Sequence, residues 1–384
     1  MSTYDIAVIG GGMVGAATAI GFAKQGQRVL LVEGREPLAF SSDQAMDIRV
    51  SAISDTSVAL LKQLGAWSAI EAMRVCPYRR LETWETQACR TRFHADSLNL
   101  DQLGFIVENR VLQLGLWQQF NQYPNLTLKC PDTLASIELG EQYPRLQLTS
   151  GEVHTATWIV GADGANSKVR EIANIGVTAW DYRQHCMLIA VETELPQQDI
   201  TWQQFTPRGP RSFLPLCGHQ GSLVWYDSPS KIKQLSRLST QALREEILST
   251  FPAELGDIKV LSHGAFPLTR RHAQCYYQNN CVLVGDSAHT INPLAGQGVN
   301  LGFKDVIALL QASQDKSLSE GALAQYQRRR RGDNLMMQTG MDMFYKGFSN
   351  SLPPVKFIRN AALKLAEHSG PVKQQVLKYA LGLA

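Results

Sequence analysis

The stretch IAVIGGGMVGAATAIGFAKQGQRVLLVE, residues 6–33, decides the fold of this chain. It opens with an apolar run typical of a buried strand, and Gly10, Gly12 and Gly15 follow in a G-x-G-x-x-G pattern. Apolar residues then recur at helical spacing, and a second apolar run closes the stretch. A strand, a glycine turn, a helix and a second strand in this order predict a Rossmann-like βαβ unit.

The glycine turn and the acidic residue after the second strand predict a dinucleotide site. The first glycine permits the tight turn, the second lets a pyrophosphate approach the backbone, and the third lets helix and strand pack closely. The helix N-terminus offers unpaired N–H groups and a partial positive charge. Glu33 lies 18 residues after Gly15, near the spacing of a carboxylate that accepts ribose hydroxyls. That carboxylate disfavours a 2′-phosphate, so FAD or NAD fits this first site and NADP does not.

Two later segments look alike: TWIVGADGANSKVR (157–170) and CVLVGDSAHTINPLAGQGVNLGFKDV (281–306). Each has an apolar run, a pair of Gly and Asp, and then a helical pattern. The pairs are Asp163-Gly164 and Gly285-Asp286. Either pair taken alone is also compatible with an ordinary turn that caps a helix.

The middle of the chain predicts a second lobe. Short aromatic-rich runs at 201–205, 211–216 and 222–226 are separated by Pro and Gly turns, which favours an antiparallel sheet. From Arg328 onward the chain looks helical and basic. The expected fold class is therefore α/β, with a Rossmann-like domain that binds FAD or NAD, an antiparallel-sheet substrate domain and a helical C-terminal region. The predicted boundaries are 1–75, 101–180 and 265–330 for the first domain, 76–100 and 181–264 for the second, and 331–384 for the last.

Composition narrows the class of protein further. The net charge of +3 is too small to indicate nucleic-acid binding, and we expect Arg328–Arg331 to form a solvated helix face. Seven cysteines show neither a C-x-x-C pair nor metal-ligand spacing, so we expect reduced thiols. No segment approaches the roughly 20 apolar residues that span a bilayer. No signal-peptide pattern opens the chain, and we expect a cytoplasmic protein.

The two later motifs resemble those of the flavoprotein aromatic hydroxylases, which p-hydroxybenzoate hydroxylase typifies. The residues that carry the resemblance are Asp163, Gly164, Ser167, Arg170, Gly285, Asp286, Pro293, Gly296, Gln297, Gly298 and Asn300. The resemblance implies that FAD is the cofactor, that Asp286 binds its ribityl chain, and that Asp163-Gly164 is tied to FAD and the nicotinamide donor. It also implies that Arg49, in the run DIRVSAIS, lies near the flavin. Asn109 is a further cofactor candidate, at a position where the family usually has Arg or Gln.

A physical reading of the last motif agrees with this resemblance. The turn 293–298 opens a helix whose N-terminus can point at the pyrimidine edge of the flavin. Reduced flavin carries negative charge there, and a helix dipole stabilises such a charge by up to about 2 kcal/mol. Gly296 and Gly298 would let the ring lie against bare backbone. Three motifs in the family's order favour one shared cofactor site over three unrelated turns.

Further stretches are similar to the ubiquinone-biosynthesis branch of this family, and the similarity spans essentially the whole chain. They are PYRRLETWE (77–85), TWQQFTPRGPRSFLPL (201–216), LVWYDSP (223–229), GAFPLTRRHA (264–273) and GMDMFYKGFSNSLPP (340–354). The resemblance implies that NAD(P)H reduces FAD, that O2 adds to form a C4a-hydroperoxyflavin, and that a polyprenylated benzoquinol ring attacks it. Two alternatives remain open: a hydroxylase for another phenol, and a flavoprotein that reduces or scaffolds without hydroxylating.

Aromatic residues of the predicted second sheet are candidates for a substrate pocket. Because side chains alternate along a strand, about half of them should face away from the flavin and pack in a core instead. The candidates are Trp202, Phe205, Phe213 and Trp225.

No catalytic base stands out, since a dihydroquinone is already activated by its para oxygen. Arg211 and Tyr226 are weak candidates as pocket residues. His289 follows the Gly-Asp pair, and we favour a structural role for it over general-base catalysis.

The C-terminal tail combines apolar and basic residues at helical spacing. We consider two readings: a surface that rests on the inner face of a membrane or on partner enzymes of the ubiquinone pathway, and helices packed on the catalytic lobes with a solvated lysine face. The apolar set is Ile358, Ala361, Ala362, Leu365, Val372, Val376, Tyr379 and Leu383, and the basic set is Lys356, Arg359, Lys364, Lys373 and Lys378.

Overall fold

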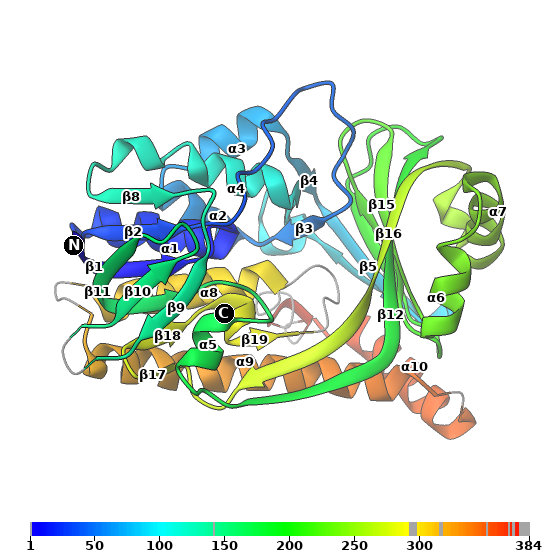
Figure 1. Cartoon of the computed structure of the whole chain (residues 1–384). Coiled ribbons are helices and arrows are strands. Elements are labelled where there is room, and N and C mark those ends of the chain that lie inside the picture. Colours follow the sequence, from blue (N-terminus) through cyan, green and yellow to red (C-terminus); the bar gives the residue numbers. More distant parts are fainter. Residues whose placement is uncertain are drawn as a thin grey trace.

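The computed structural model describes residues 2–140, 143–291, 298–314, 318–350, 352–367, 369–370 and 373–375. In these residues the chain forms two lobes that share long strands, with a long helix running beneath both (Figure 1). This arrangement confirms the expected α/β class with a second sheet and a helical C-terminal region.

The predicted βαβ unit is present at the N-terminus. Strand β1 (Ser2–Ile9) pairs in parallel with β2 (Val29–Val32), and helix α1 (Met13–Lys24) connects them. All four residues of β2 are buried, as expected for a parallel strand covered on both faces. Gly26 takes a left-handed φ of +84° and ends the helix.

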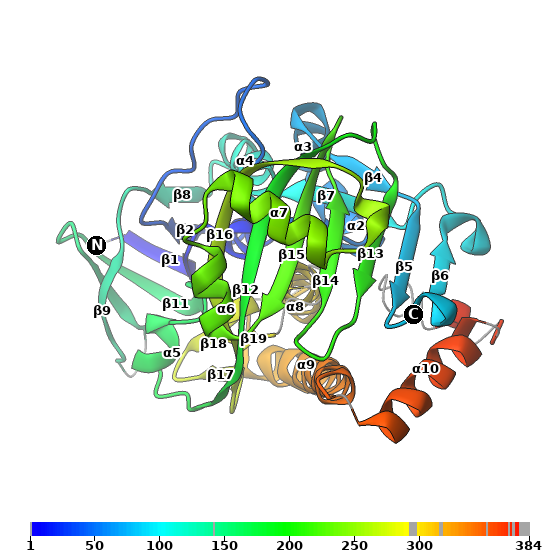
Figure 2. The same cartoon turned by 90° about the vertical axis from the view of Figure 1, so that its right-hand side faces the viewer.

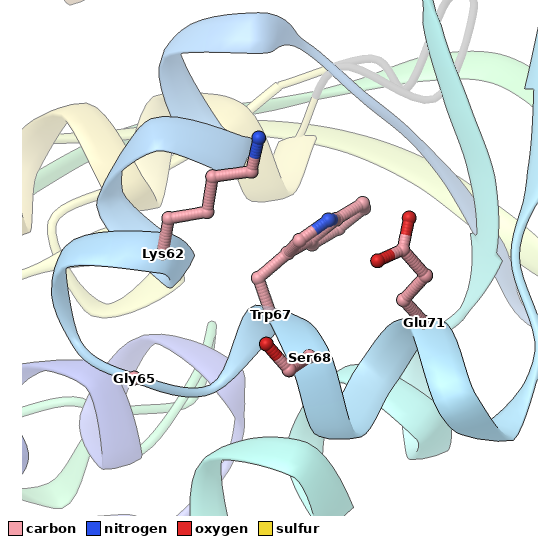
Figure 3. A pocket seen from close by; sticks show the side chains of 5 residues that line it. All are labelled: Lys62, Gly65, Trp67, Ser68 and Glu71. Carbon is pink, nitrogen blue, oxygen red and sulfur yellow. The ribbon is translucent and has the colours of Figure 1, made fainter.

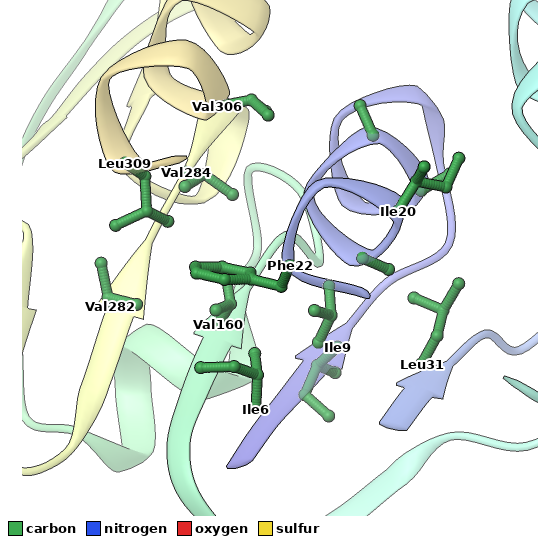
Figure 4. Close-up of a cluster of buried hydrophobic side chains, with 14 of the residues drawn as sticks. Ile6, Ile9, Ile20, Phe22, Leu31, Val160, Val282, Val284, Val306 and Leu309 are labelled. Carbon is green, nitrogen blue, oxygen red and sulfur yellow. The ribbon is translucent and has the colours of Figure 1, made fainter. Parts of the chain in front are cut away.

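The first sheet has the strand order β17-β18-β11-β1-β2-β8, with β10 and β9 added along β11. The parallel strands place their carboxyl ends along one edge, where α1 and helix α8 (Gly298–Ala312) begin. Ile20 and Phe22 of α1 join Val306 and Leu309 of α8 in one buried cluster over this sheet (Figure 4). The remaining strands are β8 (Leu126–Lys129), β9 (Leu134–Glu138), β10 (Arg145–Leu148), β11 (Val153–Gly161), β17 (Tyr277–Gln278) and β18 (Cys281–Leu283).

The second sheet has the order β19-β16-β12-β15-β14-β13-β5-β6, and it is antiparallel except for the parallel pair β13 and β5. Helices α6 (Pro229–Leu235) and α7 (Thr240–Thr250) cover its outer face, which Figure 2 shows from the front. Its strands are β5 (Arg80–Trp84), β6 (Thr91–His94), β12 (Val177–Thr193), β13 (Ile200–Gln204), β14 (Arg211–Pro215), β15 (Gln220–Asp227), β16 (Ile258–Ala273) and β19 (His289–Thr290).

The two lobes do not separate at the predicted boundaries. The boundary at 180/181 falls inside the 17-residue strand β12, and that at 264/265 falls inside the 16-residue strand β16. These two strands pair along most of their length and reach into both lobes. The boundary at 330/331 falls inside helix α9 (Glu320–Phe348), a single helix of 29 residues.

The remaining elements are a small third sheet and several further helices. A three-stranded sheet holds β3 (Val50–Ile53), β7 (Gly104–Glu108) and β4 (Cys76–Tyr78). Pro353 starts the last described helix, α10 (Pro353–Glu367), close to the predicted break. The other helices are α2 (Asp55–Gln63), α3 (Trp67–Met73), α4 (Asn109–Trp117) and α5 (Lys168–Ile172).

Candidate functional site

The glycine turn after β1 leaves an open space in front of α1. Gly10 has a φ of +100°, and a Cβ on Gly15 would lie 1.8 Å from the carbonyl oxygen of Gly10, so both positions require glycine. A Cβ on Gly12, in contrast, would meet no atom within 4 Å. Gly12 is therefore not required by packing within the protein. Its backbone faces a space that a cofactor diphosphate could occupy at the helix N-terminus.

Glu33 lies beside this turn at the end of β2. One carboxylate oxygen accepts from the Gly11 N–H at 2.5 Å and the other accepts from the Arg35 N–H at 3.0 Å. Two side chains of α4 hold the opposite side of the turn, because Gln113 and Trp117 donate to the Gly11 carbonyl at 2.9 and 2.8 Å. Sequence reasoning missed Gln113 and Trp117, although their spacing of four residues places them on one helix face.

The Asp163-Gly164 pair follows β11 and adjoins the glycine turn. Asp163 caps α5, since its Oδ2 accepts from the backbone N–H groups of Lys168 and Val169 at 2.7 and 3.1 Å. Its Oδ1 is buried and has no hydrogen-bond partner among the described residues. Gly164 has a φ of +79°, and a Cβ there would meet open space. The Asp163 Oδ2 therefore belongs to an ordinary turn that caps a helix. A contact of the Asp163-Gly164 pair with FAD remains a prediction.

Gly285 and Asp286 follow β18, the next parallel strand along the same edge. Gly285 has a φ of +61° and packs against Val14 of α1, which brings this turn beside the first glycine motif. The Asp286 side chain is accessible to solvent. The protein atoms around it still remove part of its hydration and so raise its pKa, and the charges of His289 and Arg49 oppose that rise. An accessible carboxylate that is surrounded by protein lies in a recess, as expected for a cofactor contact.

A buried ionic network holds the Gly285-Asp286 turn in place. Asp305 of α8 is fully buried, and its Oδ2 accepts from the Gly285 N–H at 3.0 Å and pairs with His289 at 2.5 Å. Its Oδ1 accepts from Arg330 at 2.8 Å and from Asn334 at 3.2 Å. Burial would raise the pKa of Asp305, but the charges and hydrogen bonds of His289 and Arg330 lower it to about 2.

This network settles two expectations. His289 is only 2% exposed and its Nε2 is paired with Asp305, so a structural role fits it better than catalysis. The expectation that Arg328–Arg331 forms a solvated face is wrong for Arg330, which is 3% exposed because α9 turns it toward Asp305. Arg328 and Arg329 are exposed as predicted.

The remaining cofactor candidates lie around the same recess. Arg49 is exposed and its guanidinium lies 5.8 Å from the ring centre of Phe266 on the second sheet. Asn109 begins α4 and accepts from the Ser51 hydroxyl at 2.7 Å. The Asn300 side chain forms hydrogen bonds with other residues of the chain. Its Oδ1 accepts from the Ser57 hydroxyl at 2.7 Å, and its Nδ2 donates to the Ala52 carbonyl at 2.7 Å.

Asn300 therefore positions the first turn of α8, and a direct contact with FAD remains a prediction. A Cβ on Gly298, the first residue of that helix, would meet none of the described residues within 4 Å. Pro293, Gly296 and Gln297 lie outside the described residues.

Taken together, the residues present fit FAD. The open space before α1, the Glu33 carboxylate and the recessed Asp286 carboxylate lie at the carboxyl ends of β1, β2 and β18 along one sheet edge. This edge is where dinucleotides bind in open α/β sheets. Arg49 extends the site toward the second sheet.

Three of the four proposed pocket aromatics face the wrong way. Trp202, Phe213 and Trp225 are at most 4% exposed and belong to the core between the second sheet and helices α6 and α7. Arg211 lies on the same outer side, since it donates to the Thr250 carbonyl of α7 at 2.9 Å. The assignment of these four residues to a flavin-facing pocket is corrected, because the alternation of the strands turns them toward the outer helices.

Phe205 and Tyr226 lie elsewhere. The ring of Phe205 stacks on Phe348 of α9, with ring centres 4.2 Å apart. Tyr226 belongs to a buried cluster on the inner face of the sheet, and its hydroxyl has no hydrogen-bond partner among the described residues. Burial raises the pKa of Tyr226 well above its ordinary value. Its hydroxyl therefore keeps its proton at neutral pH and is not a base.

The inner face of the second sheet carries half-buried apolar side chains near Arg49. Leu188 and Val224 are cross-strand neighbours on β12 and β15, and Phe266 follows on β16. A Cβ on Gly264, which pairs with Leu188, would lie 3.5 Å from Ile48. Sequence reasoning missed these three apolar residues; the signal for Leu188 and Val224 is that they alternate with outer-core residues such as Ile189 and Trp225.

A separate pocket of about 330 Å³ lies where α2 ends and α3 begins (Figure 3). Lys62, Gly65, Trp67, Ser68 and Glu71 line it. None of these is a predicted cofactor residue, so this pocket does not belong to the recess described above.

Two other features of the described residues bear on the expectations. All seven cysteines are free thiols. No helix in the described part of the chain is both long and apolar enough to cross a bilayer.

Known proteins with similar sequences identify the family of this chain. A family model described as "FAD binding domain" matches residues 3–332. The chain is 52% identical to 3-demethoxyubiquinol 3-hydroxylase of Escherichia coli (strain K12), over 99% of this chain and 98% of that protein. It is 31% identical to ubiquinone hydroxylase UbiL of Rhodospirillum rubrum, over 98% and 89% of the two chains.

Solved structures agree in fold. p-Nitrophenol 4-monooxygenase PnpA of Pseudomonas putida DLL-E4 superposes with a TM-score of 0.83 at 18% identity, covering 100% of this chain and 99% of that one. The chain belongs to the FAD-binding-domain family of FAD-dependent monooxygenases, in the branch of the ubiquinone-biosynthesis hydroxylases.

Proposed function

We propose that this protein hydroxylates the ring of a polyprenylated benzoquinol in ubiquinone biosynthesis, with FAD as cofactor and NAD(P)H and O2 as co-substrates. The observation that carries the proposal is 52% identity over essentially the whole length to an enzyme named as a 3-demethoxyubiquinol 3-hydroxylase. We assign the same class of substrate, a demethoxylated ubiquinol, to this chain.

We propose a division of labour among the residues at the sheet edge. The N-terminus of α1 binds the diphosphate at Gly12, Glu33 accepts the ribose hydroxyls, and Asp286 accepts the ribityl hydroxyls. Arg49 contributes a positive charge near the flavin end. When bound, FAD supplies the activation of O2 once a nicotinamide donor has reduced it.

We propose that the quinol ring binds on the inner face of the second sheet, against Leu188, Val224 and Phe266. These side chains are apolar and half-buried, and Arg49 over Phe266 links them to the cofactor recess. Such a surface excludes water from the reacting ring, which favours hydroxylation over loss of hydrogen peroxide. No catalytic base is needed there, because the para oxygen of a dihydroquinone already activates its ring.

The direct test supplies purified protein with FAD, a short-chain demethoxyubiquinol, a nicotinamide donor and ¹⁸O2. We expect one labelled oxygen in the quinol product by mass spectrometry, together with quinol-stimulated NAD(P)H oxidation. The Asp286→Ala variant serves as the matched control and should give neither signal.

The alternatives predict different results. Stimulation by another phenol but not by the quinol would identify a different hydroxylase. Bound FAD without any oxygenated product from a panel of phenols and quinols would indicate a reductase or scaffold, and the proposed reaction would then be wrong.

A further inference from the structure

Helix α10 is amphipathic in the reverse sense, with its polar side on the protein and its apolar side in solvent. Arg359 and Asn360 are each 8% exposed, whereas Phe357, Ile358 and Leu365 are 77%, 67% and 72% exposed. In a helix packed to complete a core, the opposite distribution is expected. The sequence-based expectation that Arg359 belongs to an outward basic face is therefore wrong.

The polar side is held by specific contacts with the second lobe. Glu85 pairs with Arg359, with Nε and Oε2 2.7 Å apart, and accepts from Asn360 at 2.6 Å. Thr86 donates to Asn360 at 3.0 Å, and Thr91 of β6 donates to the Leu363 carbonyl at 3.0 Å. These bonds fix the rotation of the helix about its axis, so the outward apolar side follows from the packing.

The outward residues form one surface, which we call the α10 apolar face: Phe357, Ile358, Ala361 and Leu365. At about 100° per residue they fall within an arc of about 100°. All four are exposed. The helix lies at the edge of the molecule beside β6 (Figure 2), so no described element covers this face.

Exposed apolar residues concentrate in this part of the chain. Seven large hydrophobic side chains of the described residues are more than half exposed, and six of them lie between 336 and 365. Monomeric surfaces carry such residues singly, and a concentration of them marks an interaction site. The six are Met336, Met343, Leu352, Phe357, Ile358 and Leu365.

The charges around the face indicate which kind of partner covers it. Residues 343–384 contain six basic residues and one acidic residue, Glu367, and of the basic ones Arg359 is paired with Glu85. Glu367 is already paired with Lys373 at 2.9 Å and accepts from the Arg92 N–H at 2.7 Å. Lys356 and Lys364 are exposed on α10 itself. Lysine is depleted in protein–protein interfaces, whereas lysines beside an apolar helix face favour a surface of anionic lipid.

We propose that the α10 apolar face docks on an anionic lipid bilayer, with Lys364, which borders this face, at the headgroups. The choice of a bilayer rests in part on the proposed function, because a polyprenylated quinol resides in the membrane. Docking through α10 places the catalytic lobes next to the pool of this substrate without a spanning helix.

Flotation with phosphatidylglycerol–phosphatidylcholine vesicles tests the proposal on the full-length, FAD-loaded protein. We expect the protein to float, and the variant Phe357→Gln/Ile358→Gln/Leu365→Gln to lose at least about tenfold in lipid affinity. The variant Lys364→Gln should lose about fivefold in lipid affinity on these vesicles and nothing on phosphatidylcholine alone. A control with three exposed leucines elsewhere, Leu139→Gln/Leu248→Gln/Leu261→Gln, should float like the parent.

Equal flotation of the parent and the triple apolar variant, or no flotation of either, would overturn the proposal. So would a dimer, detected by sedimentation velocity, that the triple apolar variant abolishes while neither protein floats, because the face would then join two copies. Hydroxylation of a short-chain quinol without vesicles separates the two proposals. If it persists in a protein that does not float, only docking fails, and if a floating protein lacks it, only the proposed reaction fails.

Discussion

The Asp305→Asn variant tests how the Gly285-Asp286 turn is held in place. Asp305 is fully buried beside His289 and the charged Arg330, and it also accepts from the Gly285 N–H. An asparagine keeps the size of the side chain but removes its charge and one acceptor. Arg330, 3% exposed, then remains as a buried charge without its main counterion.

The structure allows the magnitude to be worked out. Breaking a buried pair by removing one partner costs about 3–5 kcal/mol, since the other charge stays desolvated. Independently, a carboxyl whose pKa is about 2 in the folded chain, against an ordinary 3.8, contributes on the order of 2 kcal/mol at neutral pH. The two estimates agree that the variant should lose a few kcal/mol of its free energy of unfolding. The turn that carries Asp286 would then no longer be held by Asp305.

The assay combines urea unfolding with FAD retention. We expect the midpoint of unfolding to fall and the absorbance of bound FAD to disappear at a flavin concentration that saturates the parent. The double variant Asp305→Asn/Arg330→Met removes the unpaired charge as well, and it should recover at least about 1 kcal/mol relative to the sum of the single variants.

The pH dependence gives a further check with a defined sign. Because the folded pKa of Asp305 is below the unfolded one, its contribution is present above pH of about 4 and is lost as the pH falls toward 2. The asparagine variant should lack this part of the acid-induced loss. Unfolding of Asp305→Asn within about 1 kcal/mol of the parent, with FAD fully retained, would refute the reasoning.

Five other variants test the remaining assignments. Asp286→Ala should lose FAD with little change in the unfolding of the apoprotein, because its exposed carboxylate supports no packing, and purification with undiminished yellow colour would contradict the assignment. Gly12→Val should fold but exclude the diphosphate, whereas Gly15→Val should unfold because its Cβ would meet the Gly10 carbonyl at 1.8 Å; circular dichroism and FAD titration separate the two. Val224→Phe should retain FAD and lower quinol-dependent turnover. Its neighbour Trp225→Ala should instead cost about 3–5 kcal/mol of stability, because it leaves a cavity on the outer face. If Trp225→Ala lowered turnover and Val224→Phe lowered stability, the quinol ring would bind on the other side of the sheet.

Local patterns were enough to predict the cofactor half of the protein. Residues 6–33 contain the strand, turn, helix and strand in unbroken succession, so their contacts are local and the pattern alone determines them. The short strands of the second sheet were predicted for the same reason, since alternation and turn residues mark them directly.

Alternation shows that Trp225 and Val224 face opposite ways, but not which of them lies in the outer core. That choice depends on which side α6 and α7 cover, a contact between segments far apart in the chain. Likewise, nothing in the run 328–331 distinguishes Arg330 from its neighbours until α9 packs on α8 and brings Asp305 within 2.8 Å.

What the sequence by itself determined is the βαβ cofactor unit, the second sheet and the chemistry of the family, because each is written in contiguous motifs. Only the tertiary structure decided which face of the second sheet α6 and α7 cover, which buried charges hold the Gly285-Asp286 turn, and which side of α10 points to solvent. These depend on pairings such as Arg359 with Glu85, 274 residues apart. A helical pattern specifies a polar and an apolar side, and the partner across the fold decides which of them is buried.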